Sequence, residues 1–296
     1  MSFEIPPSLV TALRPTRHIA VLTGAGVSSE SGVPTFRDAQ TGPSALPSVA
    51  GQALWAQYDP HELATPEAFQ RNPKLVWEWY AWRRELVSQA RPNPGHIALV
   101  EMGLRLASLD AHFTLITQNV DGLHRQAGSE NVIELHGNIH RTKCFREGIV
   151  IDERPDTGET PPRCPWCGGL LRPDVVWFGE ALPRDALSAA INAAQTCDVF
   201  FSIGTSSLVQ PAASLPYLAS EHGAITVEIN LDETPLTRDV KYSLRGKAGE
   251  VLPELVTAVG ITDSASPPSG GGLFLRADRS RLEDQDTSQT LYNSVL

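Results

Sequence analysis

No apolar run in this sequence approaches the roughly twenty residues that a membrane-spanning helix needs. Residues 1–7 carry no basic segment followed by an apolar core, so we expect no secretory signal. Positive charge is scarce too: 24 Lys and Arg against 34 Asp and Glu give a net charge of −10, which argues against electrostatic binding of nucleic acid. We therefore expect partners that are neither membranes nor nucleic acids.

Cysteine is the other shortage, with four residues in a chain of 296. So few thiols exclude a disulfide framework, and the Cys164-Pro165-Trp166-Cys167 pair suits metal or redox chemistry in a reducing cytoplasm. The Gly-x-Ser-x-Gly context of a hydrolase nucleophile is missing around Ser206 and Ser207. We expect a cytoplasmic protein that uses neither disulfides nor a serine nucleophile.

What is present is the composition of a globular protein, with 41% hydrophobic and 20% charged residues. The length suits either one large domain or a large domain that carries a small one. After residue 260 the chain turns to Ser, Pro and Gly and then to charged residues without a period. This composition predicts a disordered tail over 261–296.

Four apolar, β-rich runs each end in small polar residues. They are His18–Leu22, Phe113–Ile116, Val199–Ile203 and Ala224–Ile229. Helical patterns lie between them, over Gly95–Leu109, Arg184–Cys197 and Pro211–His222. Near-continuous apolar strands are typical of a parallel sheet that is buried on both faces. The alternation predicts an α/β fold with a doubly wound, Rossmann-type sheet, in which ligands bind at the carboxyl ends of the strands.

Two stretches do not fit this alternation. Pro60–Ala90 has a helical pattern, with a start at Thr65-Pro66-Glu67 and an aromatic-rich helix over Leu75–Val87. Thr142–Leu171 is rich in Pro, Gly and Cys and indicates a zinc-ribbon-like module. We predict a core over residues 9–260, in which a large domain (9–42, 94–141 and 172–260) carries a smaller one (43–93 and 142–171).

The first polar loop, Thr23-Gly24-Ala25-Gly26, follows a strand and leads to Pro34-Thr35-Phe36-Arg37. Glycines without a Cβ let backbone N–H groups approach a pyrophosphate, and a helix that starts near Val27 would point its positive end at that anion. Because Ser29 occupies the place of a third fingerprint glycine, the alternative is a tight turn without a ligand.

The second polar loop, Gln118-Asn119-Val120-Asp121, offers donors and acceptors for a ribose and an amide. The alternative is a helix start capped by Asn119 or Asp121. His136-Gly137 closes a further apolar run, and histidine titrates near neutral pH, so His136 is a candidate general base. A structural histidine is the alternative.

Cys164 and Cys167 resemble one half of a zinc knuckle, whose upstream half should be another Cys-x-x-Cys, but the chain has Cys144-Phe145-Arg146-Glu147 there. Sixteen residues separate Glu147 from Cys164, a spacing proper to a four-ligand ribbon. Three thiolates and one carboxylate could hold zinc tetrahedrally. The alternative is a module that has lost its metal.

Tyr80 and Arg83 lie three residues apart and so share one face of the aromatic-rich helix. An arginine beside a tyrosine on an apolar helix can clamp a carboxylate. The alternative is an ordinary solvated arginine.

In their order and spacing, these motifs resemble the sirtuin family of NAD-dependent protein deacylases, of bacterial type, over roughly residues 9–260. The resemblance is carried by Gly24-Ala25-Gly26-Val27-Ser28, Gly32-Val33-Pro34-Thr35-Phe36-Arg37, Thr117-Gln118-Asn119-Val120-Asp121, His136-Gly137 and Gly204-Thr205-Ser206. It implies removal of an acyl group from a substrate lysine, with release of nicotinamide and O-acyl-ADP-ribose.

The resemblance also implies roles for individual residues. His136, as the base, and Asn119 would be catalytic. The NAD-binding residues would be Gly24, Ala25, Gly26, Ser28, Pro34, Thr35, Phe36, Arg37, Gln118, Asn119, Asp121, Gly204, Thr205, Ser206, Asn230, Asp232 and Ala248. The substrate peptide would pair strand to strand with a segment that includes Val176, Phe178, Gly179 and Glu180. One structural zinc ion would be held by Cys144, Cys164 and Cys167, with Glu147 in the place of the family's fourth cysteine.

Residues 76–84 resemble the class III branch of the family, which removes succinyl, malonyl and glutaryl groups. In that branch the residues that match Tyr80 and Arg83 bind the distal carboxylate, so we expect desuccinylase and demalonylase activity, with deacetylation weaker or comparable. Pro43–Ala53 departs from the family as an insertion that suggests a flap near the cofactor. The rival hypotheses are a protein ADP-ribosyltransferase, an NAD or ADP-ribose binding module without turnover, and a zinc-ribbon nucleic-acid binder.

Overall fold

The computed structural model describes residues 4–33, 60–151 and 158–260. Three predictions fall outside these ranges: the loop Pro34–Arg37, the insertion at 43–53 and the tail over 261–296. They stay predictions.

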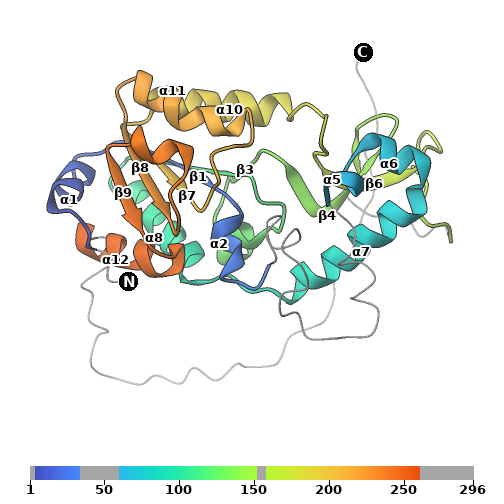
Figure 1. Cartoon of the computed structure of the whole chain (residues 1–296), viewed down its shortest axis with the longest axis horizontal. Helices are drawn as coiled ribbons and strands as arrows, with labels where there is room; N and C mark the ends of the chain where they lie inside the picture. Colours follow the sequence, from blue (N-terminus) through green and yellow to red (C-terminus); the bar gives the residue numbers. More distant parts are fainter. Residues whose placement is uncertain (1–3, 34–59, 152–157, 261–296) are drawn as a thin grey trace, which may run out of the picture. The chain divides into compact units, whose positions relative to one another are not determined.

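Six strands form a parallel sheet in the order β3-β2-β1-β7-β8-β9, with helices packed along it (Figure 1). The strands are β1 His18–Thr23, β2 His112–Thr117, β3 Ile133–Glu134, β7 Val199–Ile203, β8 Ile225–Asn230 and β9 Tyr242–Arg245. The chain builds outward from β1 to one edge and then from β7 to the other, so the order reverses between β1 and β7. The predicted doubly wound sheet is confirmed, and a topological switch point of this kind is where such sheets bind ligands.

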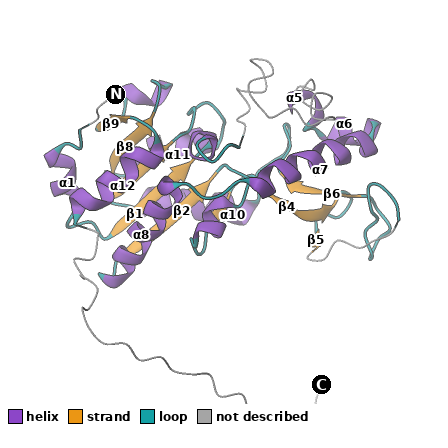
Figure 2. Ribbon diagram, turned by 90° about the horizontal axis from the view of Figure 1, so that it is seen from below, coloured by secondary structure: helices purple, strands orange, loops and turns teal. Residues whose placement is uncertain are grey.

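Helices cover both faces of this sheet. Helices α1 (Pro7–Leu13), α8 (Pro94–Ser108) and α12 (Ala248–Val259) share one buried cluster with the strands, and α10 (Arg184–Thr196) and α11 (Leu215–Glu221) share another. Figure 2 shows the same layers from a second direction. Every residue of β7 is buried, which explains why its sequence is continuously apolar.

One helix differs from its prediction. The pattern predicts a single helix over Pro211–His222, but the structure has a short 3-10 turn, η1 (Ala212–Ser214), and then α11. Pro216 lies in the first turn of α11, where its missing N–H costs nothing, whereas it would break the hydrogen-bond ladder of a helix that began five residues earlier. Pro216, which lies inside the predicted helical pattern, therefore marks the start of α11.

A second sheet, antiparallel and of three strands, has the order β5-β4-β6. Its strands are β4 Gly137–Cys144, β5 Val150–Ile151 and β6 Leu171–Val175, and the helices α5 (Pro60–Leu63), α6 (Pro66–Arg71) and α7 (Pro73–Gln89) accompany it. The Thr65 hydroxyl accepts the Ala68 N–H and caps α6, as predicted. Strand β4 runs across the predicted domain boundary at 141/142 and β6 across that at 171/172; the domain division stays a prediction.

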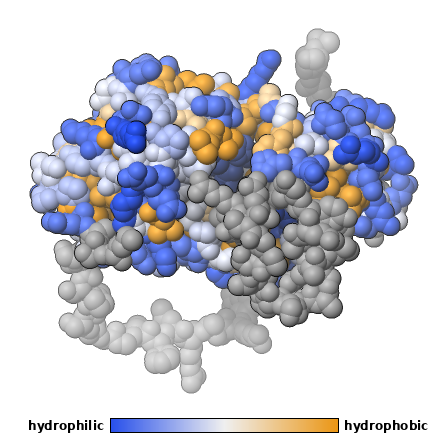
Figure 3. Space-filling model, viewed as in Figure 1, coloured by the Kyte–Doolittle hydropathy of each residue, from blue (hydrophilic) through white to orange (hydrophobic). Residues whose placement is uncertain are grey.

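An aromatic core joins α6 and α7 to β4 and to the segment after β6. Its largest members are Phe69, Trp79, Tyr80 and Trp177. Among the described residues, no helix is both long and apolar enough to cross a membrane. On the face in Figure 3, apolar side chains lie in separate patches between hydrophilic ones.

Candidate active site

The loops that follow β1, β2, β7 and β8 begin side by side at one edge of the large sheet. The Gln118 N–H donates to the Thr23 carbonyl (3.0 Å), the Gly24 N–H to the Ile203 carbonyl (3.0 Å) and the Gly204 N–H to the Ile229 carbonyl (2.9 Å). These bonds extend the ladders of the sheet by one residue each. The polar loops that the sequence singled out are therefore brought together.

Gly24 and Gly26 pack directly against the backbone of Gly204. A Cβ on Gly24 or on Gly26 would lie 2.8 Å from the Gly204 carbonyl oxygen. Gly204 itself has φ +58° and leaves no room for a Cβ, which would lie 2.6 Å from the Val27 nitrogen. Glycine is required at these three positions because the backbones of the two loops are in contact, which leaves no room for a Cβ.

The N–H groups of Gly24 and Gly26 themselves bond inside the protein, and the approach of other backbone N–H groups to a pyrophosphate stays a prediction. The Gly24 N–H bonds to Ile203, and the Gly26 N–H bonds to the Gly204 carbonyl at 2.7 Å, so neither is left for a pyrophosphate. The helix α2 (Ala25–Ser29) begins two residues before the predicted start at Val27. The contact between the two loops accounts for the glycine hydrogen bonds, and the local sequence does not contain that information.

Asn119, Ser28 and Asp121 form one hydrogen-bonded cluster. The Asn119 amide donates to Ser28 Oγ and to the Gly24 carbonyl, both at 2.9 Å, and Ser28 Oγ donates to Asp121 Oδ2 at 2.7 Å. Burial raises the pKa of Asp121 above its ordinary value. Asp121 also accepts the Leu123 N–H (2.8 Å) at the start of α9 (Leu123–Ala127), so its helix-start role is present beside any ligand role.

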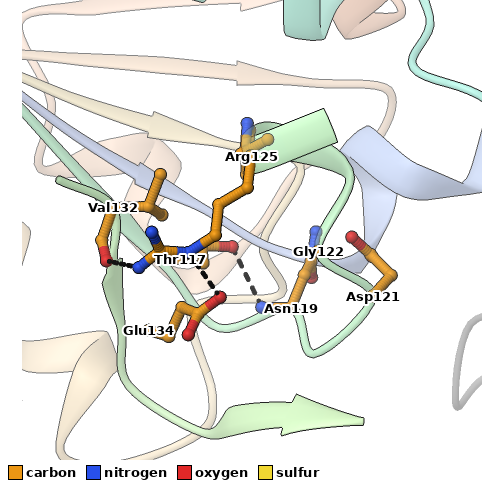
Figure 4. A pocket seen from close by; sticks show the side chains of 8 residues that line it. Thr117, Asn119, Asp121, Gly122, Arg125, Val132 and Glu134 are labelled. Atoms are coloured by element: carbon orange, nitrogen blue, oxygen red, sulfur yellow. Dashed lines mark hydrogen bonds and ion pairs between the residues drawn. The ribbon is translucent and has the colours of Figure 1, made fainter. Parts of the chain in front are cut away.

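The loop is also tied to the strand beside it. In Figure 4 the Asn119 N–H donates to Thr117 Oγ1 (3.0 Å), and Arg125 reaches Glu134 and the Val132 carbonyl, each at 3.2 Å. These residues line a small hollow behind the loop. The loop is therefore tied to β2, and α9, which follows the loop, is tied to β3.

His136 directly precedes β4, and its Nδ1 lies 2.9 Å from the Gln118 carbonyl oxygen. A carbonyl only accepts, so Nδ1 carries the proton and Nε2 of the neutral ring is the free base. Burial lowers the pKa of His136, against a smaller opposing effect of this hydrogen bond. The Val176 N–H donates to the His136 carbonyl at 2.9 Å and holds the backbone from the other side.

The remaining predicted NAD-binding residues of the described chain follow β7 and β8, except Ala248, which follows β9 and begins α12. Thr205 Oγ1 accepts from the Gln118 amide at 2.9 Å, and its carbonyl accepts from the Asn230 amide at 2.8 Å. Asp232 is exposed, and Arg245 donates to its carbonyl at 2.7 Å. Ala248 is buried, and its backbone would lie about 3.0 Å from a Cβ on Gly95.

Some residues at this edge were missed by sequence reasoning. His124 is buried with Nε2 2.9 Å from Thr23 Oγ1, and burial lowers its pKa to about 3. Leu208, Val209 and Leu231 are large apolar side chains that stay exposed just after β7 and β8. The available signal was an apolar residue directly after the polar end of a strand.

Tyr80 and Arg83 lie on the side of α7 that meets the aromatic core. Tyr80 is 3% exposed, and burial raises its pKa to about 12. The Arg83 guanidinium lies 5.0 Å from the centre of the Trp79 ring, and burial lowers its pKa. Arg83 is only partly exposed, unlike the solvated arginine that was the alternative.

The predicted substrate segment follows β6 as a turn. The Phe178 N–H donates to the Ala64 carbonyl (2.9 Å), and the Phe178 ring stacks on His61 at 4.3 Å. Gly179 has φ +86° in this turn. The Glu180 carboxylate is taken up by Arg172 and by the Trp177 N–H, so its side chain serves inside the protein.

Cys144, Cys164 and Cys167 bring their sulfur atoms within 4.8 Å of one another. Two of the three are buried, and the Gly169 N–H points at Cys167 Sγ (3.4 Å) as in a metal knuckle. Three converging thiols fit a structural zinc ion, which would hold β4 and the segment before β6 together. The Glu147 carboxylate is not part of this group, and Glu147 is exposed, so its role as the fourth ligand stays a prediction.

Known proteins are similar to this chain in sequence. The Sir2 family model matches residues 24–211. The chain is 51% identical over 247 residues to an NAD-dependent protein deacylase 2 of Pyrobaculum aerophilum, covering 83% of this chain and 93% of that protein. It is 51% identical over 243 residues to an NAD-dependent protein deacylase of Pyrococcus furiosus, covering 80% and 91%.

Solved structures resemble the chain over most of its length. A Sir2 homologue in complex with NAD has a TM-score of 0.75 at 45% identity and covers 88% of this chain and 96% of its own. A mutant Sir2 homologue in complex with 2′-O-acetyl ADP ribose has a TM-score of 0.74 at 44% identity, covering 88% and 100%. A Sir2 protein bound to an acetylated peptide has a TM-score of 0.69 at 29% identity, covering 86% and 98%.

Proposed function

We propose, on the premise that this chain belongs to the Sir2 family and is an NAD-dependent protein deacylase, that the acyl groups it removes best end in a carboxylate, as succinyl and malonyl groups do. The substrates would be acylated lysine side chains of proteins, in line with the acetylated peptide bound by a related Sir2 protein. NAD supplies the ribose that takes up the acyl group, and the products are free lysine, nicotinamide and O-acyl-ADP-ribose.

The bare Nε2 of His136 is the observation that supports the catalytic part. With Nδ1 committed to the Gln118 carbonyl, the ring can take a proton only at Nε2. Nε2 would accept the proton of a ribose hydroxyl and so make that oxygen nucleophilic. Asn119 and Asp121, which Ser28 links, would position the ribose and the nicotinamide amide.

Tyr80 and Arg83 are the observation that supports the acyl preference. Both lie on the side of α7 that meets the aromatic core, where burial disfavours the charged guanidinium and lowers the pKa of Arg83. A neutral acetyl group gives such a cation nothing, whereas a succinyl carboxylate pairs with it and with the phenol. The site therefore discriminates by the group at the far end of the acyl chain.

The test measures NAD-dependent mass loss from matched acetyl-, succinyl- and malonyl-lysine peptides. We expect Arg83→Met to lower kcat/KM for the succinyl peptide about 50-fold, the scale of a lost hydrogen-bonded charge pair, and to leave the acetyl peptide within about threefold. Arg84→Met removes the same charge one residue further on, where the guanidinium lies over Trp77, and is the matched control.

Two results would contradict the proposal. Equal succinyl turnover by Arg83→Met and by the unsubstituted enzyme would refute the acyl preference. ADP-ribose found covalently on protein, without loss of acyl groups, would favour the ADP-ribosyltransferase alternative. His136→Ala, which lacks the base, is the background for both measurements.

A further inference from the structure

We infer that Trp177 is a positioning residue for acyl selectivity, because its indole N–H fixes the direction in which the Tyr80 hydroxyl donates. This inference rests on the proposed preference for acyl groups with a terminal carboxylate. It concerns a residue 97 positions from Tyr80 in the sequence, in the segment that links β6 to the substrate turn.

The two side chains are buried against each other. Trp177 is 2% exposed, and its Nε1 donates to the Tyr80 oxygen at 2.9 Å. An indole nitrogen can only donate, so the phenol oxygen is the acceptor and its own proton points elsewhere. Within the described part of the chain, the Tyr80 hydroxyl donates to no other group. Tyr80 is thereby set up as a donor toward a ligand.

Trp177 cannot readily turn away from this bond. The Arg172 guanidinium lies 3.2 Å from the centre of the indole ring, and Arg172 is itself 2% exposed. Glu180 binds Arg172 through both carboxylate oxygens and accepts the Trp177 backbone N–H at 2.8 Å. An ion pair between the buried Arg172 and the partly exposed Glu180 therefore holds both the backbone and the ring of Trp177.

The direction of the Tyr80 proton decides which acyl groups fit. An ionised carboxylate only accepts hydrogen bonds, so it matches a hydroxyl that must donate, next to the Arg83 guanidinium three residues along α7. An acetyl methyl leaves that donor unpaired. If the indole N–H were absent, the hydroxyl could turn to other acceptors, and the match to a carboxylate would weaken.

The experiment compares kcat/KM for succinyl- and acetyl-lysine peptides in Trp177→Phe, Tyr80→Phe and the double variant. We expect Trp177→Phe to lower the succinyl value about tenfold, the scale of one hydrogen bond to a charged ligand, and the acetyl value by less than about threefold. In the Tyr80→Phe background, Trp177→Phe should change the succinyl-to-acetyl ratio by less than about twofold.

Trp82→Phe is the matched control. Trp82 packs against the same aromatic core, and its indole nitrogen has no hydrogen-bond partner among the described residues, so the variant loses an indole without this bond. We expect its succinyl-to-acetyl ratio to equal that of the unsubstituted enzyme.

Two outcomes would overturn the inference: an equal fall for both peptides in Trp177→Phe, or the same tenfold loss of selectivity with and without the Tyr80 hydroxyl. If Arg83→Met abolishes the succinyl preference while Trp177→Phe leaves it intact, the inference fails and the proposed function stands. If the unsubstituted enzyme prefers acetyl peptides, both fail.

Discussion

His136 shows what a single hydrogen bond decides at the residue scale. The Gln118 carbonyl fixes the tautomer, and burial lowers the pKa of the ring, so the neutral base persists at pH values where an exposed histidine would already be protonated. Both effects favour a neutral ring whose Nε2 is unprotonated and can accept a proton.

We predict that the acidic limb of the pH profile of kcat/KM has its midpoint below 6.5, the ordinary pKa of histidine. Activity requires the neutral ring, so it falls as the pH drops through the lowered pKa. The profile should be measured with an acetyl peptide, because the carboxylate of a succinyl peptide also takes up a proton at acidic pH and would add a second titration to the profile. A midpoint above 6.5 would contradict the assignment, and His136→Ala should lose about 100-fold or more in activity.

The role of a single residue could be predicted from the sequence where the residue belongs to a motif. It could not be predicted where the role depends on a contact between residues far apart in the chain. His136 and Asn119 lie among the polar loops that the motifs marked. The bond between Trp177 and Tyr80 and the pair of Arg172 with Glu180 depend on how β6 meets α7, which no local pattern encodes.

At the scale of elements, one buried carboxylate joins three pieces of structure. Glu228, on β8, is 1% exposed and accepts from the Thr234 hydroxyl, from Thr237 at 2.7 Å in η2 (Pro235–Arg238), and from Arg245 at 3.0 Å on β9. Arg245 also donates to the Asp232 carbonyl. Glu228 and Arg245 therefore fix the loop after β8 to strands β8 and β9.

We predict that Glu228→Gln lowers the free energy of unfolding by about 3 kcal/mol. The glutamine amide has one oxygen acceptor in place of two, and its NH₂ group would face the donors of Arg245 and of the threonine hydroxyls. Urea unfolding measures the change. Glu250→Gln is the control: its pair with Lys247 is exposed and 3.8 Å long, so the change should stay below about 0.5 kcal/mol. Equal unfolding midpoints for the two variants would rule out this role of Glu228.

The sequence predicted four of the six strands of the large sheet, together with α8, α10 and the aromatic-rich helix in α7. It did not predict β9, because Tyr242–Arg245 has only Leu244 fully buried and so carries no apolar run. Strand β3 has two residues, too few for a periodic pattern. Edge strands are specified by their neighbours more than by their own residues.

At the scale of the whole molecule, strand β4 connects the three cysteines to His136, the proposed base. The strand begins directly after His136 and ends at Cys144, so zinc bound at the thiols would fix the end of the strand that lies far from His136. The metal would act on the fold and not on the chemistry.

We predict about one zinc ion per chain by metal analysis, and a lower melting temperature after chelation, with activity lost in parallel with the circular dichroism signal of the small sheet. Glu147→Cys should slow zinc loss to a chelator about tenfold or more, because a fourth thiolate completes the tetrahedron. A protein that melts at the same temperature with and without metal would show that packing alone holds the module.

The reversal of strand order between β1 and β7 has a consequence for how the enzyme holds together. The proposed NAD site draws on chain positions near 24, 118, 204 and 230, which become neighbours only when both halves of the sheet are complete. NAD bound there would bind the folded sheet and not the unfolded chain, so it would shift the unfolding equilibrium toward the native state.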